Sequence, residues 1–374
     1  MIAENTEPSW TESERWQVDS PLVHIGVVEG DPLYQLHRVI GAVRLTDGRI
    51  VVANGGTNEL RFYDHMGRYL STAGRTGEGP GEFRQLARLD AMRGDTLVVF
   101  DGALRRISLF DAAGTFVRTF GLPAIDERTY PRPRGGVFAD GSVLAYTERS
   151  AGPGTVVREP GLFYRIGAGD TVPRIIGEFP IRGFFVDSLA GSMVLPFEPH
   201  SWPVAAGEVF YVGHGGGFDI GVYSRDGVLV RQIRWLRTPE QVTADDVTRF
   251  MDGQLARIED VDLRERLRPR YEEVYSRLET PLSKPAFSDI RIDRESNIWA
   301  AEYRSPGGSL DAWFVFNPEG RLLGRVDFPE GVIVYHIGTD AVVARSTHDL
   351  GVEHIIMYRL RKPGSSDDTR NTRP

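Results

Sequence analysis

The feature that most constrains the fold is an internal repeat of short apolar strands separated by turns. One unit runs from Gly41 to Gly74 and holds the strands RIVVAN and ELRFYD, with turns at Asp47-Gly48 and Gly67. The next unit, LARLDAMRGDTLVVFDGALRRISLFDAAGTFVRTFG, keeps this order at an offset of about 47 residues, a period typical of β-propeller blades. Each unit therefore predicts one four-stranded blade.

Weaker copies of the repeat give four further units, and the last one, GVIVYHIGTDAVVARSTHDLGVEHIIMYRL, ends after three strands. The segment ERWQVDSPLVHIG near the N-terminus carries strand-forming residues, and we expect it to supply the missing strand. Such closure hides the edges of the last sheet. The sequence thus predicts an all-β, six-bladed β-propeller as a single domain over residues 14–361, with a tail at 1–13 and a disordered tail at 362–374.

One segment, residues 238–281, breaks the β pattern between blades four and five. Thr243 and Asp246 form a capping-box-like start, and apolar residues then recur at helical spacing. A second helical stripe follows, with Pro269 as an expected kink or break. The helical pair has two open interpretations: a clip that packs on the propeller face, or a lid over the channel mouth that forms one wall of a pocket.

The glycine-rich stretch GRTGEGPGEF, residues 74–83, raises the question of a phosphate loop. No Gly-Lys-Ser/Thr follows it, Pro80 removes a donor, and Glu78 and Glu82 would repel an anion. We interpret it instead as the crossing between the outer strand of blade one and the inner strand of blade two, with Phe83 packed between these blades.

These residues resemble a known family. GRTGEGPGEF, TDGRIVVAN and FDAAGTFVRTF are similar to the repeats of bacterial six-bladed, NHL-like β-propellers, and the likeness covers Trp16 to Leu360. The resemblance implies the fold and an extracytoplasmic address (periplasmic, secreted or lipid-anchored) if a leader has been removed, and otherwise a cytoplasmic one. It implies no reaction, because six-bladed propellers include lactonases, amidating lyases and binding modules.

The composition of the chain limits the classes of partner that it can bind. The formal net charge is -8, from 52 acidic and 44 basic side chains, which disfavours nucleic acid as a partner. The sequence has no apolar run of about 20 residues that would predict a transmembrane segment. Cysteine is absent, so neither disulfides nor thiolate metal sites can form. We expect a monomer that binds a small molecule or a protein.

Loops that lead into the inner strands should line the channel mouth, where propeller function usually gathers. Arginines there would suit an anionic small molecule or a carboxylate-bearing peptide. Alternatively, they pair with Glu82, Glu198 and Asp289 and only hold loops in place. The predicted ligand-binding residues are Arg38, Arg84, Arg134, Trp202 and Tyr335.

Two imidazoles and a carboxylate could also approach one another at the mouth. His200, Asp289 and His336 form the candidate metal set, for Zn²⁺ or Ca²⁺. No pair of them has a local ligand spacing, and a wet channel could satisfy each one with hydrogen bonds instead. The first hypothesis is therefore a non-catalytic, cofactor-free binding module, with the mouth and the helical insertion holding the ligand. The alternative is a metal-dependent hydrolase or lyase with its site in the channel.

Overall fold

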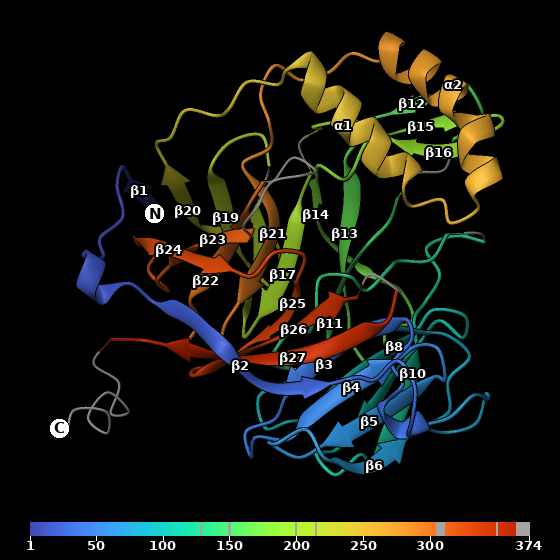
Figure 1. Ribbon diagram of the computed structural model, residues 1–374, viewed down its shortest axis with the longest axis vertical. Helices are drawn as coiled ribbons and strands as arrows, with labels where there is room; N and C mark the ends of the chain where they lie inside the picture. Colours follow the sequence, from blue (N-terminus) through green and yellow to red (C-terminus); the bar gives the residue numbers. More distant parts are fainter. Residues whose placement is uncertain are drawn as a thin grey trace.

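The computed structural model describes residues 1–127, 129–148, 151–198, 200–213, 215–303, 311–348 and 351–363; the side chain of Trp202 is also left undescribed. The strands form six sheets around a central channel and one smaller sheet (Figure 1). The six-bladed prediction is confirmed. The predicted C-terminal disorder concerns residues that lie almost wholly outside the described ranges.

Blades one and two follow the repeat most closely, with four antiparallel strands each. Their strands are β3 (Val39–Arg44), β4 (Ile50–Asn54), β5 (Glu59–Tyr63) and β6 (Tyr69–Ala73), then β7 (Leu86–Ala91), β8 (Leu97–Asp101), β9 (Arg106–Phe110) and β10 (Phe116–Gly121). Short 3-10 helices, η1 (Glu12–Glu14) and η2 (Pro32–Tyr34), precede them.

Blades four to six repeat the arrangement around the channel. Their strands are β17 (Trp202–Ala206), β18 (Val209–Gly213), β19 (Asp219–Ser224) and β20 (Leu229–Trp235); β21 (Phe287–Ile292), β22 (Ile298–Glu302), β23 (Asp311–Phe316) and β24 (Leu322–Phe328); and β25 (Ile333–Ile337), β26 (Ala341–Thr347) and β27 (Glu353–Arg361). One buried apolar cluster lies between each pair of neighbouring blades and forms the core.

Blade three is irregular at its inner edge. Its regular strands are β11 (Val143–Tyr146), β13 (Gly161–Ile166) and β14 (Arg174–Phe179). Within the blade the inner segment makes only isolated bridges, between Arg132 and Tyr146 and between Val137 and Val143, and Gly136 makes another with Ala205 of blade four. Pro131 and Pro133 explain this, because proline has no backbone N–H to give to the ladder.

The N-terminal region closes the ring, as predicted. Strand β2 (Gln17–Ile25) pairs antiparallel with β27 and completes blade six (Figure 1). The assignment of residues 1–13 to a tail is wrong, however, because β1 (Ile2–Asn5) pairs in parallel with β20 of blade four. The short strand is anchored by the buried side chain of Asn5, which accepts from the Leu322 N–H at 2.7 Å and donates to the Gly320 carbonyl at 3.0 Å.

We expect Asn5→Ala to lower the free energy of unfolding by about 1 kcal/mol, because each hydrogen bond contributes about that much and water can reach a frayed terminal strand. Urea unfolding followed by tryptophan fluorescence would measure the change. The exposed Glu4 offers a control, and Glu4→Ala should have little effect. Equal stabilities of Asn5→Ala and the wild type would show that β1 is not held through this side chain.

The helical insertion is confirmed in place, but its packing differs from the clip interpretation. Helix α1 (Ala244–Leu255) and helix α2 (Val261–Arg277) cover a small sheet of β12 (Val156–Val157), β15 (Phe184–Asp187) and β16 (Gly191–Val194). We call these five elements the inserted unit; it lies together at one end of the molecule (Figure 1). Its own core holds Met193, Met251, Leu255, Tyr271, Val274 and Tyr275. The apolar stripe of the helices thus packs on this sheet, and α2 continues through Pro269 without a break.

The glycine-rich stretch is a hydrogen-bonded corner, as interpreted. Gly74 and Gly81 have positive φ angles of 77° and 74°, and Phe83 is fully buried between blades one and two. The guanidinium of Arg106 donates to carbonyls of the loop, including that of Gly79 at 2.8 Å. A loop that turns acceptors inward to a cation is the opposite of a phosphate cradle.

No helix in the described part of the chain is both long and apolar enough to cross a membrane.

Candidate functional site

Topology places the inserted unit on the mouth face of the propeller. The chain reaches each inner strand from the outer strand of the blade before, so these connections share one face. The connection from β14 to β17 holds β15 and β16, and that from β20 to β21 holds α1 and α2. The connection between β11 and β13, which holds β12, lies on the same face because neighbouring strands are antiparallel.

Arg38 and Arg84, two of the predicted mouth residues, lie in loops whose backbone conformation is fixed. The buried Asp101 accepts the N–H of Arg84 at 2.7 Å, and Asn54 occupies the matching place in blade one. The Arg84 side chain pairs with Glu78 at 2.6 Å. Arg38 is exposed and has a φ of 53°. Among the described contacts, nothing joins these two side chains to the other predicted residues.

The remaining predicted ligand-binding residues have different surroundings. The carbonyl of Arg134 accepts from Arg88 inside the channel, while the Arg134 side chain is exposed. Tyr335 donates its hydroxyl to the Val39 carbonyl at 2.8 Å and thereby joins blade six to blade one; burial raises its pKa. Tyr335 is therefore a structural contact. Trp202 begins β17, and its side chain lies outside the described structure.

The expected acidic partners of the mouth arginines pair with other arginines. The observed ion pairs are Arg75–Glu82 at 2.7 Å, Arg158–Glu198 at 2.7 Å and Arg291–Asp289 at 2.8 Å.

Beneath the mouth, ion pairs fill the channel from opposite sides. Arg88 of β7 pairs with Asp90 at 2.5 Å, and Arg291 of β21 pairs with Asp289. These strands belong to blades two and five, which face each other across a ring of six. Burial alone would lower the pKa of Arg88, but Asp90 and then Asp289 raise it. Two positive and two negative charges thus form a neutral floor under the mouth.

Ion pairs also connect the blades at the far end of the channel. Arg294 of blade five donates to the Arg44 carbonyl at 2.7 Å and pairs with Asp95 of blade two at 3.3 Å. Arg44 in turn pairs with Asp340 of blade six at 2.6 Å. These contacts join blades one, two, five and six at the far end of the channel.

The candidate metal set is not brought together, and that prediction is wrong. His336 lies near the far end, where burial and then the charges of Arg294 and Arg44 lower its pKa to about 3. Asp289 is engaged by Arg291 in the floor. The described ranges contain no group of three or more His, Asp or Glu side chains that could hold a metal ion.

His200, the third member of that set, lies on the mouth face. Its Nδ1 is 3.2 Å from the Glu198 carbonyl oxygen. Burial, followed by the charge of Arg182, lowers the pKa of His200 to about 4. The imidazole is therefore neutral at pH 7 and carries none of the positive charge of the mouth.

Arg182 is the arginine of the mouth face whose charge adds to burial in lowering the pKa of His200 and acts on Tyr303. It lies between β14 and β15, in a segment fixed by two hydrogen bonds: Ser201 N–H to the Pro180 carbonyl at 2.8 Å and Leu195 N–H to the Gly183 carbonyl at 3.0 Å. The first bond places Arg182 beside His200. We call the residues that interact around it the mouth cluster: Arg134, Tyr146, Glu148, Arg182, His200, Arg257 and Tyr303.

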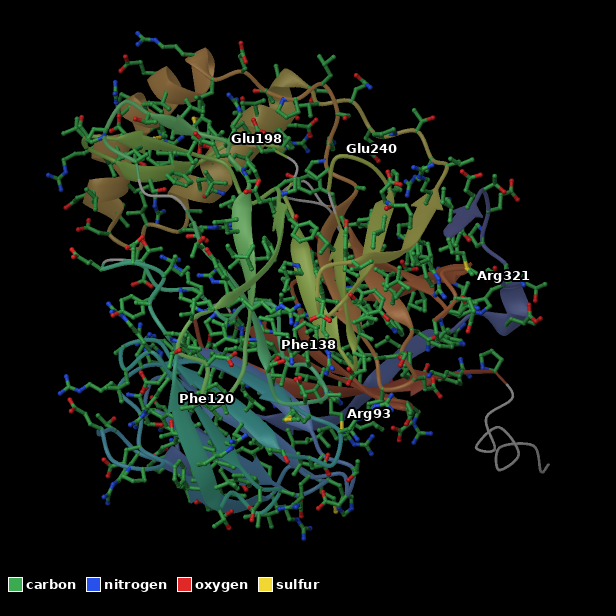
Figure 2. All side chains as sticks on the ribbon, turned by 180° about the vertical axis from the view of Figure 1, so that it is seen from behind. Arg93, Phe120, Phe138, Glu198, Glu240 and Arg321 are labelled. Carbon is green, nitrogen blue, oxygen red and sulfur yellow. The ribbon has the colours of Figure 1, made fainter. Side chains whose placement is uncertain are left out.

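The mouth cluster joins three parts of the molecule. Tyr146 comes from blade three, Tyr303 follows β22 of blade five, and Arg257 follows α1 of the inserted unit. The ring of Phe197 connects the last two parts, because it lies 5.6 Å from the ring of Phe250 in α1 and 5.9 Å from that of Tyr303. Figure 2 shows Glu198, the residue that follows Phe197, beside the helices of the inserted unit.

The cluster contains three arginines, Arg134, Arg182 and Arg257, and one carboxylate, that of Glu148. Arg182 remains accessible to water, yet desolvation and then the charge of Arg257 lower its pKa. Burial and Asp246 raise the pKa of Tyr303 to about 12, so its hydroxyl is neutral. Arg134, Arg182 and Arg257 make no ion pair with any other residue that the structure describes.

Sequence reasoning named Arg134 and His200 but missed the rest of the cluster. The rule that connections into inner strands line the mouth would have found Arg182, which lies in PIRGFF between blades three and four. Arg257 and Tyr303 carry no such signal, because their approach depends on how the inserted unit sits on the blades.

Comparisons with known proteins agree with this architecture. A family model described as a 6-bladed beta-propeller matches residues 35–138. No curated protein matches the sequence. Among solved structures, a member of the DUF4221 family from Bacteroides vulgatus is similar at a TM-score of 0.53 and 9% identity, covering 94% of this chain and 100% of that one.

A second similar structure is virginiamycin B lyase from Staphylococcus aureus, with a TM-score of 0.42 and 9% identity over 92% of this chain and 99% of that one. At such identities the likeness concerns the fold alone. The family match supports a six-bladed propeller without narrowing it to the NHL-like proteins. The chain is thus a six-bladed β-propeller whose mouth face carries an inserted α/β unit.

Proposed function

We propose that the protein is a non-catalytic binding module that holds a ligand at the channel mouth, beside the inserted unit. The observation that carries the proposal is the meeting of three parts around Arg182: blade three, blade five and the inserted unit. The ion pairs of Arg88 with Asp90 and of Arg291 with Asp289 lie below. Several polar groups that converge from different segments are a usual feature of a ligand site.

The arrangement favours binding over metal-dependent catalysis. A hydrolase or lyase of the kind considered above needs imidazoles and carboxylates that converge on one ion. In this chain His200 and His336 lie at different levels of the channel and have different charged neighbours. In this proposal the inserted unit forms one wall of the binding site, as in the lid interpretation, and its own apolar core holds its helices on its sheet.

A thermal-shift screen with a small-molecule library of acids, amines, sugars and short peptides tests the proposal. Hydrogen exchange would then locate each stabilising compound, and we expect protection in residues 132–137, 180–183 and 254–258. Proton NMR of the same mixture should show the compound unchanged after hours. Protection confined to turns on the opposite face, such as 92–96, would contradict the location, and conversion of the compound would contradict the non-catalytic role.

A further inference from the structure

A pocket with a volume of about 440 Å³ lies between blades two and three. Arg118 of β10, the outer strand of blade two, forms one side. Blade three supplies the rest, from Ser142 in the turn before β11 and from residues around the turn that joins β13 to β14. Because β13 leads away from the connection that holds β12, this turn lies on the face opposite the mouth. We call this site the rim pocket, and its volume is within the range of about 300–1,000 Å³ that small-molecule sites have.

Most of the charges at the floor of the rim pocket balance one another. The ion pairs there are Arg165–Asp140 at 2.5 Å, Arg174–Asp226 at 3.0 Å, Arg225–Asp140 at 3.2 Å and Arg225–Glu208 at 3.0 Å. They contain three positive and three negative side chains. Arg165 also donates from Nε to the hydroxyl of the buried Ser142 at 3.0 Å. The floor is therefore fixed and neutral without a ligand.

Arg118 differs from these lining arginines. Within the described ranges no carboxylate lies at ion-pair distance from its guanidinium. Its side chain is on the same side of β10 as that of Phe120, since side chains two residues apart share a face of a strand, and its guanidinium carbon lies 6.0 Å from the centre of the Phe120 ring. Phe120 packs on the apolar cluster between blades two and three. Arg118 therefore faces blade three.

Asp170 is the other lining charge that lacks a partner of opposite sign among the described residues. Its Oδ2 accepts the N–H of Gly167 at 2.6 Å, and its own N–H donates to the Gly167 carbonyl at 3.2 Å. These reciprocal bonds hold the carboxylate at the turn. Arg118 and Asp170 thus line one pocket with opposite charges, yet they form no ion pair with each other.

We propose that the rim pocket binds a small zwitterion of the amino-acid class, at a second site that is separate from the mouth. The fork of the Arg118 guanidinium suits the carboxylate of the ligand through two parallel hydrogen bonds, and the Asp170 carboxylate accepts from its ammonium group. A ligand with a single charge would leave either Arg118 or Asp170 without a partner. Val172 also lines the pocket and is 74% exposed, so it offers an apolar surface to an aliphatic side chain of the ligand.

Leucine is the probe that tests the proposal on the full chain. Its two controls keep the branched apolar end and one charge each: 4-methylpentanoate lacks the ammonium group, and 3-methylbutylamine lacks the carboxylate. Titrations at pH 7 and constant ionic strength, followed by proton NMR of the ligand, give the three dissociation constants. We expect leucine to bind at least about fivefold more tightly than either control, because one charge-assisted contact in a partly solvated pocket adds about that factor. Leucine that binds no better than the controls, or not at all, would overturn the proposal.

Variants assign each charge of the ligand to one side chain. Arg118→Gln should weaken leucine at least about fivefold and leave 3-methylbutylamine unchanged. Asp170→Asn keeps an acceptor for the Gly167 N–H, and it should weaken leucine while leaving 4-methylpentanoate unchanged. The matched control is Arg68→Gln, which removes an exposed arginine beside β6, the outer strand of blade one, and it should bind leucine like the wild type. An equal loss in Arg68→Gln would reveal a general charge effect and refute the proposal.

Hydrogen exchange with saturating leucine locates the ligand. We expect protection in residues 140–142 and 167–173, with the mouth segments 180–183 and 254–258 unchanged. Protection of the mouth segments alone would refute the rim pocket and leave the proposed function standing. The reverse case is equally distinct: if no compound of the screen protects the mouth while leucine protects 167–173 in the wild type and not in Arg118→Gln, the proposed function fails and the rim pocket stands.

Discussion

Phe83→Ala should lower the free energy of unfolding by about 3–5 kcal/mol, the usual cost of emptying the place of a buried phenylalanine. Phe83 is fully buried between blades one and two, with its ring 5.7 Å from that of Phe110. The crossing closes over it through hydrogen bonds to its backbone: its N–H donates to the Arg75 carbonyl at 2.8 Å and its carbonyl accepts from Gly77 at 3.0 Å. The crossing cannot collapse into the cavity left by the Phe83 ring without breaking these hydrogen bonds.

A double-mutant cycle with Gly74 makes this prediction sharper. A Cβ at Gly74 would lie 2.5 Å from the Phe83 ring, and the φ of 77° already disfavours other residues. Gly74→Ala should therefore destabilise the wild type more than it destabilises Phe83→Ala, where the ring is absent. Urea unfolding of the four proteins measures the coupling, with the exposed Val117→Ala as a control. Additive effects would show that the glycine and the ring do not meet.

The fold could be predicted because its signals are local and repeated. The turns recur with glycines of positive φ at Gly48, Gly67 and Gly114, and the apolar strands between them recur at the same spacing. The missing strand of the last unit required a partner, and only a distant segment could supply it. Such evidence accumulates over several copies, so one irregular blade, such as blade three, does not obscure it.

The inserted unit and the mouth cluster occur once in the sequence, so no repeated copies could reveal them. Strands β12, β15 and β16 are two to four residues long and come from two different connections, so each is too short to show a period. His336 was misplaced for a related reason. The pairing of β25 shifts register between Val334 and His336, and a shift of this kind changes where the following side chains point. Convergence of Arg182 with Arg257 depends on tertiary packing, which a single sequence does not display.

A buried ion pair holds the inserted unit together and predicts how acid should loosen it. The carboxylate of Asp187, at the end of β15, accepts from Arg270 of α2 at 2.6 Å and from the N–H groups of Leu189 and Ala190 at 2.9 and 2.8 Å. The bonds from Arg270, and then those from the two amides, outweigh burial and lower the pKa of Asp187 from 3.8 to about 2. The carboxylate is inaccessible, but it lies under a partly exposed Arg270.

A pKa lowered in the folded state stabilises that state above the unfolded value of 3.8, and the contribution is lost as the pH falls toward 2. Asp187→Asn should therefore reduce the stability of the unit by about 2 kcal/mol at pH 7, which is about a 30-fold loss of hydrogen-exchange protection. The difference from wild type should shrink between pH 4 and 2.5, because a protonated aspartate resembles asparagine.

Exchange in α2, corrected for intrinsic rates and measured at pH 7 and 2.5, checks both parts of this expectation. The matched control is Asp252→Asn, which removes the exposed pair with Arg268 in the same unit and should change little, since exposed pairs contribute little. A difference between wild type and Asp187→Asn that stayed constant down to pH 2.5 would mean that packing, rather than the charge of Asp187, fixes α2 on its sheet. The predicted pH dependence would instead show that the ion pair of Asp187 with Arg270 holds the helices of the inserted unit, which wall the mouth, on the small sheet.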